Sequence, residues 1–244
     1  MKKIFASFLA VIMLISLCSC SGLSEFDFDS YVHHDRYSVG DFEYTAADIT
    51  SVDIDWIIGS VDIVVSDKQT LSVTETSGDI DDKMKVHWLI EDDQLKIKFC
   101  ASAFHGKVKP ENKQLTLEIP AGMEIKIDNV SADITFEGAA KSVDISNVSG
   151  NIDLRYLDVR SLELETVSGN ADISLVNCRK VDVDSISGNV TVALATDLGA
   201  TVEFDSVSGK LSCVNYTIKD GKYVIGDGFC SVRIDTVSAN ATVY

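Results

Sequence analysis

The feature that most constrains the fold is a repeat of about nineteen residues in the second half of the chain. Val-Ser-Gly or a close variant recurs there, and its serines are 18, 19, 19, 21 and 30 residues apart. A regular period near twenty is typical of stacked repeats, each of which is too small to bury its own apolar face. The repeated tripeptides occupy residues 130–132, 148–150, 167–169, 186–188, 207–209 and 237–239.

Apolar residues alternate on both sides of each tripeptide. Leu162 and Leu164 precede one Val-Ser-Gly, for example, and Ala171 and Ile173 follow it. A period of two marks strands with one buried face, and the glycine between them turns the chain. Strands stacked ~4.8 Å apart from coil to coil give parallel sheets, whose crossovers favour the right-handed sense. We therefore predict an all-β, single-domain parallel β-solenoid, similar to a right-handed β-helix, with coils of about nineteen residues.

Two irregular segments predict local structure outside the regular coils. Asp220-Gly221 lies between alternating apolar residues, which indicates a β-hairpin beside the terminal coil. Residues 107–113 are polar and contain Pro110, which favours an exposed loop. The first half of the chain has the same strand–Gly–strand form with less regularity, so we treat residues 46–244 as one domain.

The first twenty residues predict export and lipid attachment. Met1-Lys2-Lys3 precedes an apolar run at residues 4–17, which is typical of a secretory signal and short for a membrane span. Leu17-Cys18-Ser19-Cys20 resembles a bacterial lipobox, which implies that Cys20 becomes the lipidated first residue and tethers the chain to the membrane. Plain secretion is the alternative. We expect a signal peptide at 1–19, the lipidated cysteine and a flexible linker at 20–45, and an extracytoplasmic, lipid-anchored location.

Four stretches of sequence resemble a known family. They are Asp-Trp-Ile-Ile-Gly-Ser-Val at 55–61, Leu-Thr-Leu-Glu-Ile-Pro-Ala-Gly at 115–122, the Val-Ser-Gly units, and Ile-Gly-Asp-Gly at 225–228. Together they resemble the bacterial putative-adhesin family of β-strand repeats, a domain of unknown function, over residues 46–244. The resemblance implies a β-helical envelope protein, often a lipoprotein, and it supplies no catalytic motif.

The charge and the residue types favour a binding role. A formal net charge of −17 disfavours nucleic acid as a partner, since phosphate must be neutralised by cations. We predict a non-enzymatic adhesion, binding or envelope-sensing module without a cofactor, with an envelope protein or glycan as partner. The alternatives are a polysaccharide lyase or hydrolase and a scaffold in an envelope-stress complex. The repeats contain no histidine to serve as a base, and Arg155, Arg160, Arg179, Lys180 and Lys210 form no cluster in the sequence.

The outward positions before each tripeptide are acidic. If the coils stack in register, their carboxylates lie about 5 Å apart, and each pair costs roughly 1 kcal/mol even in water. A solvated acidic face that keeps a β-rich protein soluble is the favoured interpretation, and a Ca²⁺-binding face is the alternative. The candidate ligands are Asp144, Glu163, Glu165, Asp182, Asp184, Glu203 and Asp205.

Asparagines and cysteines complete the candidate residues. Asn151, Asn170, Asn189 and Asn240 follow the turning residue of their repeats, which predicts a structural ladder of side-chain amides from coil to coil. Cys100, Cys178, Cys213 and Cys230 permit three disulfide connectivities in an exported chain. Free thiols in the core are the favoured interpretation, and Cys213–Cys230 is the one pairing that we consider.

Overall fold

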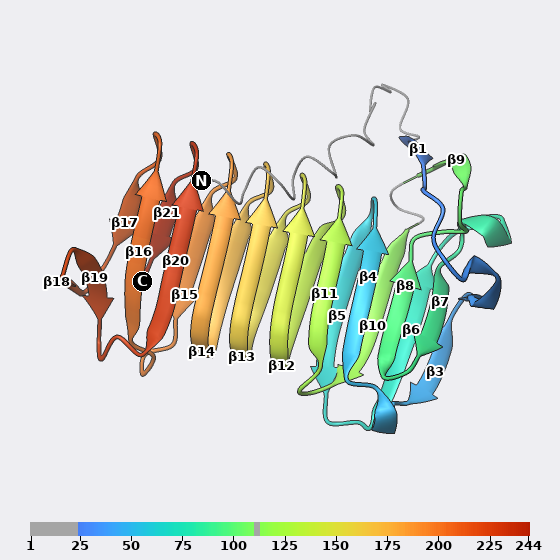
Figure 1. The fold of residues 1–244 in the computed structure, drawn as a ribbon, viewed down its shortest axis with the longest axis horizontal. Helices are drawn as coiled ribbons and strands as arrows, with labels where there is room; N and C mark the ends of the chain where they lie inside the picture. The colour runs from blue at the N-terminus through green and yellow to red at the C-terminus, as the bar shows by residue number, and fades with distance from the viewer. Residues whose placement is uncertain (1–23, 110–112) are drawn as a thin grey trace.

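The computed structural model describes residues 24–109 and 113–244; the predicted signal peptide and Cys20 lie outside these residues. The described chain is built of strands stacked along one axis into a rod (Figure 1). Its helical elements are three single turns of 3-10 helix, η2 (His34–Arg36), η3 (Ala46–Asp48) and η4 (Asp82–Met84). The prediction of an all-β solenoid is confirmed.

The coils form two main faces. The first face contains the strands that precede each tripeptide, and the second contains those that follow it. The first face runs, in spatial order, β8 (Gln94–Lys98), β4 (Ser51–Trp56), β11 (Glu124–Asn129), the second halves of β12 (Asp133–Asn147), β13 (Ile152–Thr166) and β14 (Ala171–Ser185), then β20 (Cys230–Thr236) and β16 (Ala200–Ser206). The second face runs β10 (Gln114–Pro120), β5 (Ser60–Ser66), the first halves of β12 to β14, then β15 (Val190–Leu194), β21 (Ala241–Val243) and β17 (Leu211–Cys213). All of these neighbours pair in parallel.

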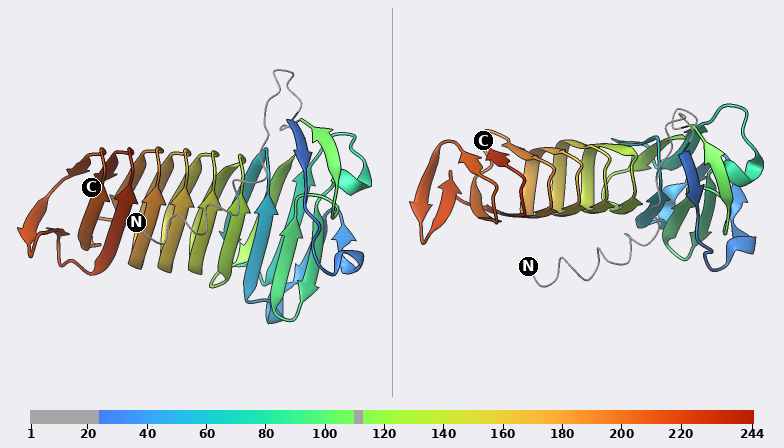
Figure 2. Two further views of the ribbon diagram at one scale, coloured as in Figure 1. Left: turned by 45° about the horizontal axis from the view of Figure 1, so that its top comes forward. Right: turned by 90° about the horizontal axis from the view of Figure 1, so that it is seen from above.

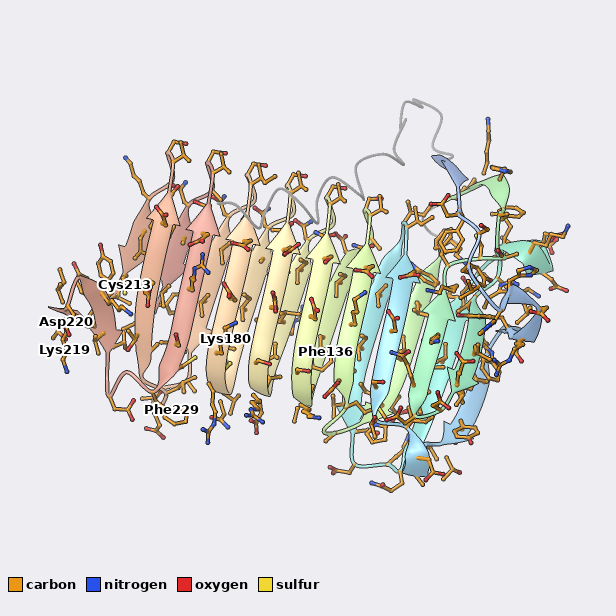
Figure 3. All side chains as sticks on the ribbon, in the orientation of Figure 1. Phe136, Lys180, Cys213, Lys219, Asp220 and Phe229 are labelled. Carbon is orange, nitrogen blue, oxygen red and sulfur yellow. The ribbon has the colours of Figure 1, made fainter. Side chains whose placement is uncertain are left out.

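Aliphatic side chains fill the interior between the faces. Leu162 and Leu164 are 1% and 0% exposed, and the ring of Phe136 is fully buried (Figure 3). A short third side closes each coil, where Ala140, Val159 and Cys178 lie in register. Each large apolar side chain buried in this way contributes about 1.5–3 kcal/mol, which a single coil could not retain without its neighbours.

A buried polar ladder, which we did not predict, closes the turns at the end of the first face. Asn147 Nδ2 donates to the carbonyl of Gly150 at 2.6 Å, and Asn129 Nδ2 donates to Asn147 Oδ1 at 2.7 Å. Smaller hydroxyl residues take the same role in later coils. The ladder comprises Asn129, Asn147, Thr166, Ser185, Thr236 and Ser206. These bonds satisfy turn carbonyls and amides that would otherwise be buried without partners.

The predicted asparagine ladder lies on the outside of the same turns. Asn170 Nδ2 donates to Asn151 Oδ1 at 3.4 Å, whereas the remaining steps use backbone donors. Asn170 Oδ1 accepts from the amide of Asn189 at 3.0 Å, and Asn189 Oδ1 accepts from the amide of Asn240 at 3.2 Å. The amide of Lys210 then donates to Asn240 Oδ1 at 3.1 Å, so Asn240 is placed between coils that precede it in the sequence.

The terminal coil is inserted into the rod. β20 lies between β14 and β16, and β21 lies between β15 and β17. The end of the rod is formed by the predicted hairpin of β18 (Tyr216–Lys219) and β19 (Lys222–Ile225), which turns through Asp220 and Gly221 at φ of 51° and 78° (Figure 2). β19 pairs antiparallel with β16 and so covers the last edge of the first face.

The opposite end is a cap of antiparallel strands, where the regular solenoid prediction does not hold. β3 (Phe42–Thr45) pairs with β6 (Thr70–Thr76), β6 with β10, β2 (Ser38–Val39) with β7 (His87–Glu91), and β7 with β8. β1 (Ser24–Asp27) and β9 (His105–Val108) form a separate antiparallel pair.

The described part of the predicted linker at 20–45 is therefore folded, and its interpretation as a flexible tether is wrong. Phe42 stacks on Trp88 with ring centroids 3.8 Å apart, and the Tyr31 hydroxyl donates to the Cys100 carbonyl at 3.2 Å. These aromatic side chains gain more from packing on the cap than from solvation on a free tether.

The prediction of an exposed loop is wrong at Lys113. Its side chain is fully buried, and its ammonium donates to the carbonyls of Met84 at 2.6 Å and Phe99 at 2.7 Å. It also forms an ion pair with Glu75 and lies 4.8 Å from the centroid of the Trp56 ring. Burial raises the pKa of Glu75 and lowers the pKa of Lys113, so each charge depends on the other.

Candidate functional site

The predicted acidic residues form two neighbouring columns on the first face. Register places Asp144, Glu163 and Asp182 on successive coils, and Glu165 next to Asp184. The inserted strand β20 then adds Arg233 and Asp235, which separate these residues from Glu203 and Asp205. The columns are thus interrupted where the sequence order would have continued them.

Burial, and then the neighbouring carboxylates, raise the pKa of several of these groups. Burial, and then the neighbouring Glu163, raises the pKa of Asp144. Burial raises the pKa of Glu165 and of Asp184 as well, with further contributions from Asp184 and Asp235 respectively. Asp184 Oδ1 is buried without a hydrogen-bond partner. At neutral pH the carboxylates of this face therefore repel one another, and the cations and hydrogen-bond donors around them do not fully compensate this repulsion.

The predicted columns do not gather a set of metal ligands. In the part of the chain that the structure describes, the group of carboxylates that comes within 4.8 Å is Asp53, Asp55 and Asp128, at the cap end of the same face. Lys98 already pairs with Asp55, and Lys126 with Asp128. Calcium binding by the predicted residues stays a prediction, which calorimetric titration of the protein with Ca²⁺ checks.

We expect the charge of this face to make the protein more stable in mild acid. A carboxyl whose pKa is raised by folding stabilises the fold most below its unfolded pKa, and that contribution is lost as the pH rises through the folded value. Asp184→Asn should therefore raise the melting temperature at pH 7 by about 2–4 °C, which corresponds to relief of ~1 kcal/mol of repulsion. Its gain should shrink as the pH falls towards the carboxyl range.

The control is Asp172→Asn, which removes an exposed carboxylate from the second face. Melting curves from pH 4.5 to 7.5 compare the two variants. Equal melting temperatures for both variants throughout this range would contradict an electrostatic origin.

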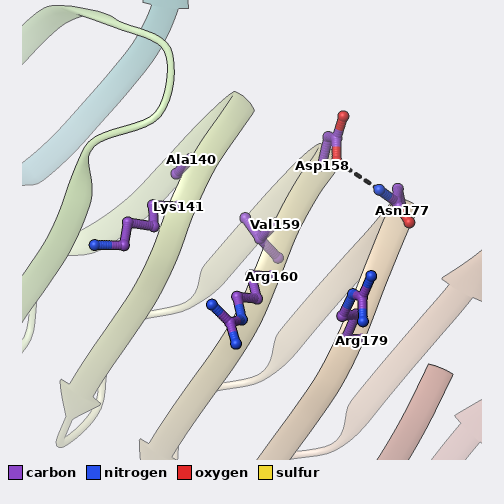
Figure 4. A pocket seen from close by; sticks show the side chains of 7 residues that line it. All are labelled: Ala140, Lys141, Asp158, Val159, Arg160, Asn177 and Arg179. Carbon is purple, nitrogen blue, oxygen red and sulfur yellow. Dashed lines mark hydrogen bonds between the residues drawn. The ribbon is translucent and has the colours of Figure 1, made fainter.

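A basic groove on the third side is the feature that the sequence analysis missed. Lys141, Arg160 and Arg179 lie on successive coils and line a groove of about 470 Å³ (Figure 4). Arg160 and Arg179 form no ion pair with any described carboxylate, whereas Lys141 pairs with Glu124 at 2.6 Å. The inference that Arg160 and Arg179 form no cluster is wrong, and their common spacing of 19 residues with Lys141 was the available signal.

The remainder of the groove is both apolar and polar. Ala140 and Val159 are buried and form part of its lining. Asn177 Nδ2 donates to Asp158 Oδ1 at 3.0 Å, so one carboxylate of the groove is already engaged. The Arg179 guanidinium lies 5.6 Å from the centroid of the exposed Phe229 ring. Lys141, Arg160 and Arg179 occupy the same position in three successive coils, so their side chains form a positive strip on an otherwise acidic protein.

The other candidates are structural. The repeat serines form hydrogen bonds from coil to coil. Ser149 and Ser168, for example, each donate to a carbonyl of the preceding coil at 3.2 Å. Cys213 lies opposite Val243 on the second face, whereas Cys230 begins β20 on the first. The Cys213–Cys230 pairing is therefore wrong, and Cys100, Cys178, Cys213 and Cys230 are free thiols, as the favoured interpretation predicts.

The architecture defines the class of protein, an all-β solenoid of parallel coils with a cap at each end. The chain belongs to the Toastrack DUF4097 family, whose model matches residues 82–243. No curated protein matches it. No helix among residues 24–109 and 113–244 is long and apolar enough to cross a membrane.

Three solved structures are similar over most of this chain. A putative cell adhesion protein from Clostridium sporogenes shares 13% identity at a TM-score of 0.42, covering 84% of this chain and 99% of its own. A putative adhesin from Parabacteroides merdae shares 12% at a TM-score of 0.34, covering 88% and 99%. A putative adhesin from Bacteroides fragilis shares 14% at a TM-score of 0.34, covering 85% and 97%.

Proposed function

We propose that this protein is a non-enzymatic adhesion or binding module of the bacterial cell envelope, tethered outside the cytoplasm by a lipid on Cys20. The signal-like start and the Leu-Cys-Ser-Cys motif support the location. A rigid rod suits this role, since its side chains keep a constant spacing from coil to coil. The proposed partner is an anionic glycan of the envelope, which carries carboxylate or phosphate groups along its length.

The basic groove is the observation that supports this partner. Arginine binds carboxylate and phosphate through paired N–H groups, and neighbouring coils ~4.8 Å apart let successive cations follow one linear polymer. Arg160 and Arg179 are exposed and have no described acidic partner, so binding costs them no existing ion pair. The acidic first face repels the same polymer and confines it to the groove.

The test is binding of the purified full-length protein in detergent to polygalacturonate, to a glycerol-phosphate polymer and to neutral dextran. We expect binding to at least one anionic polymer, none to dextran, and about tenfold weaker binding for Arg160→Ala/Arg179→Ala, because each exposed charged contact contributes below ~1 kcal/mol. Binding should weaken as salt is raised.

The matched control is Arg155→Ala, which removes an exposed arginine paired with Asp153 away from the groove. Equal loss in both variants, or binding to neither anionic polymer, would refute the groove as the binding site. Shortening of polygalacturonate by the wild-type protein would instead support the alternative of a polysaccharide-active enzyme.

A further inference from the structure

Two buried thiols meet where the terminal coil enters the rod. Cys178 lies on the third side of the coil formed by β14, and Cys230 is the first residue of β20. β20 pairs directly with β14, with Ser231 opposite Lys180, so Cys230 and Cys178 precede this pair by one and two residues on adjacent strands. Both are free thiols in this structure, and each influences the pKa of the other. Both side chains are 0% exposed.

The other described cysteines are placed elsewhere. Cys213 ends β17 on the second face, and Cys100 lies in the cap at the opposite end of the rod, where its carbonyl accepts from Tyr31. The juxtaposition of Cys178 and Cys230 follows from the insertion of β20 between β14 and β16, since a coil added in sequence order would have stacked against β16 alone.

We propose that Cys178 and Cys230 form a disulfide in the exported protein, which fastens the inserted terminal coil to the coil before it. Without the link, the terminal coil is held by hydrogen bonds and apolar contacts to β14 and β16. With it, residues 178–230 become a closed loop, which reduces the entropy of the unfolded chain. The inference rests on the export that we propose, because disulfides persist in oxidising compartments.

The chemistry is thiol–disulfide exchange with an external disulfide such as oxidised glutathione. The Cys178 thiolate attacks one sulfur of the oxidant and releases one thiol; Cys230 then attacks the mixed disulfide and releases the second. One S–S bond of the oxidant breaks and one Cys178–Cys230 bond forms. The two electrons and two protons of the cysteine pair pass to the two oxidant thiols.

The exchange precedes docking of the terminal coil. In the folded chain the Cys178 thiol donates to the Lys180 carbonyl at 3.1 Å, and Cys178 and Cys230 are both fully buried. Cys178 is covered by β20 only once the terminal segment has docked, so the exchange belongs to folding, before the coil closes.

The test refolds the reduced protein from urea in oxidised and reduced glutathione, blocks free thiols by alkylation, and maps the linked peptides by mass. We expect one link, between the peptides that contain Cys178 and Cys230, with Cys100 and Cys213 alkylated. The oxidised protein should melt about 10 °C above the same protein treated with reductant. This comparison needs no variant and does not depend on where the protein is located.

Two variants separate the outcomes. Cys213→Ser should retain the reductant-dependent shift, and Cys230→Ser should lose it. Alkylation of both Cys178 and Cys230 after oxidative refolding would overturn the proposal, as would a link to Cys100 or Cys213. If the link forms on refolding but protein isolated from its native membranes carries free thiols, export to an oxidising compartment is refuted and the chemical site stands.

Discussion

Lys113→Met should lower the free energy of unfolding by about 3–5 kcal/mol, because it leaves the Glu75 carboxylate buried without its cation. Methionine retains much of the apolar stem, so the loss reports the charge and not the volume. The Lys113 ammonium also satisfies the carbonyls of Met84 and Phe99, which lose their donor in the variant. Urea unfolding followed by tryptophan fluorescence measures this directly, since Trp56 lies 4.8 Å from the ammonium.

A second variant distinguishes the ion pair from general damage to the cap. Glu75→Leu/Lys113→Met removes both charges, and we expect it to recover a large part of the loss, since an apolar pair of similar volume replaces a desolvated ion pair. Lys85→Met is the matched control, because Lys85 pairs with Asp82 at the surface, and we expect it to leave the free energy of unfolding nearly unchanged. If Lys113→Met unfolds like Lys85→Met, the buried pair does not stabilise the cap.

The regular coils could be predicted from the sequence, but the antiparallel cap could not. The regular coils could be predicted because each strand repeats the same two-residue alternation at the same interval, so pattern and packing agree. In the cap no interval recurs, and the contacts join segments distant in the sequence: β3 pairs with β6, while Phe42 of β3 stacks on Trp88 of β7. The sequence around Lys113 is polar, so it does not indicate that the carbonyls of Met84 and Phe99 and the Glu75 carboxylate surround this side chain in the core.

The order of the last coils could not be predicted for a different reason. A strand with the correct alternation can pair at the end of the rod or between two coils, so the tripeptide at 237–239 does not reveal its neighbours. The insertion of β20 decided both which acidic residues are adjacent and which cysteines meet. The basic groove, by contrast, could have been predicted from the sequence, because Lys141, Arg160 and Arg179 repeat with the period of the coils.

The glycine of the central tripeptide should be among the most sensitive positions in the regular coils. A Cβ added at Gly169 would lie 1.9 Å from the Gly150 carbonyl oxygen and 2.6 Å from Asn147 Nδ2. The nearer of these atoms belongs to the backbone of the neighbouring coil. Strand pairing fixes the coils on both sides, so this backbone cannot move away without a change of register. The glycine is therefore required by the close approach of two coils.

Gly169→Val should accordingly cost about 3 kcal/mol or more, the upper range of overpacking a closed core. Gly169→Ala already places its Cβ against the Gly150 carbonyl and should cost about 2 kcal/mol, less than valine because it adds no further methyl groups. Ser168→Ala, next to Gly169 on the exposed side of the same turn, loses one hydrogen bond to Val148 and should change stability by less than ~1 kcal/mol. Denaturant unfolding ranks the three variants, and a Gly169→Val protein as stable as Ser168→Ala would mean that the coils are not held at this spacing.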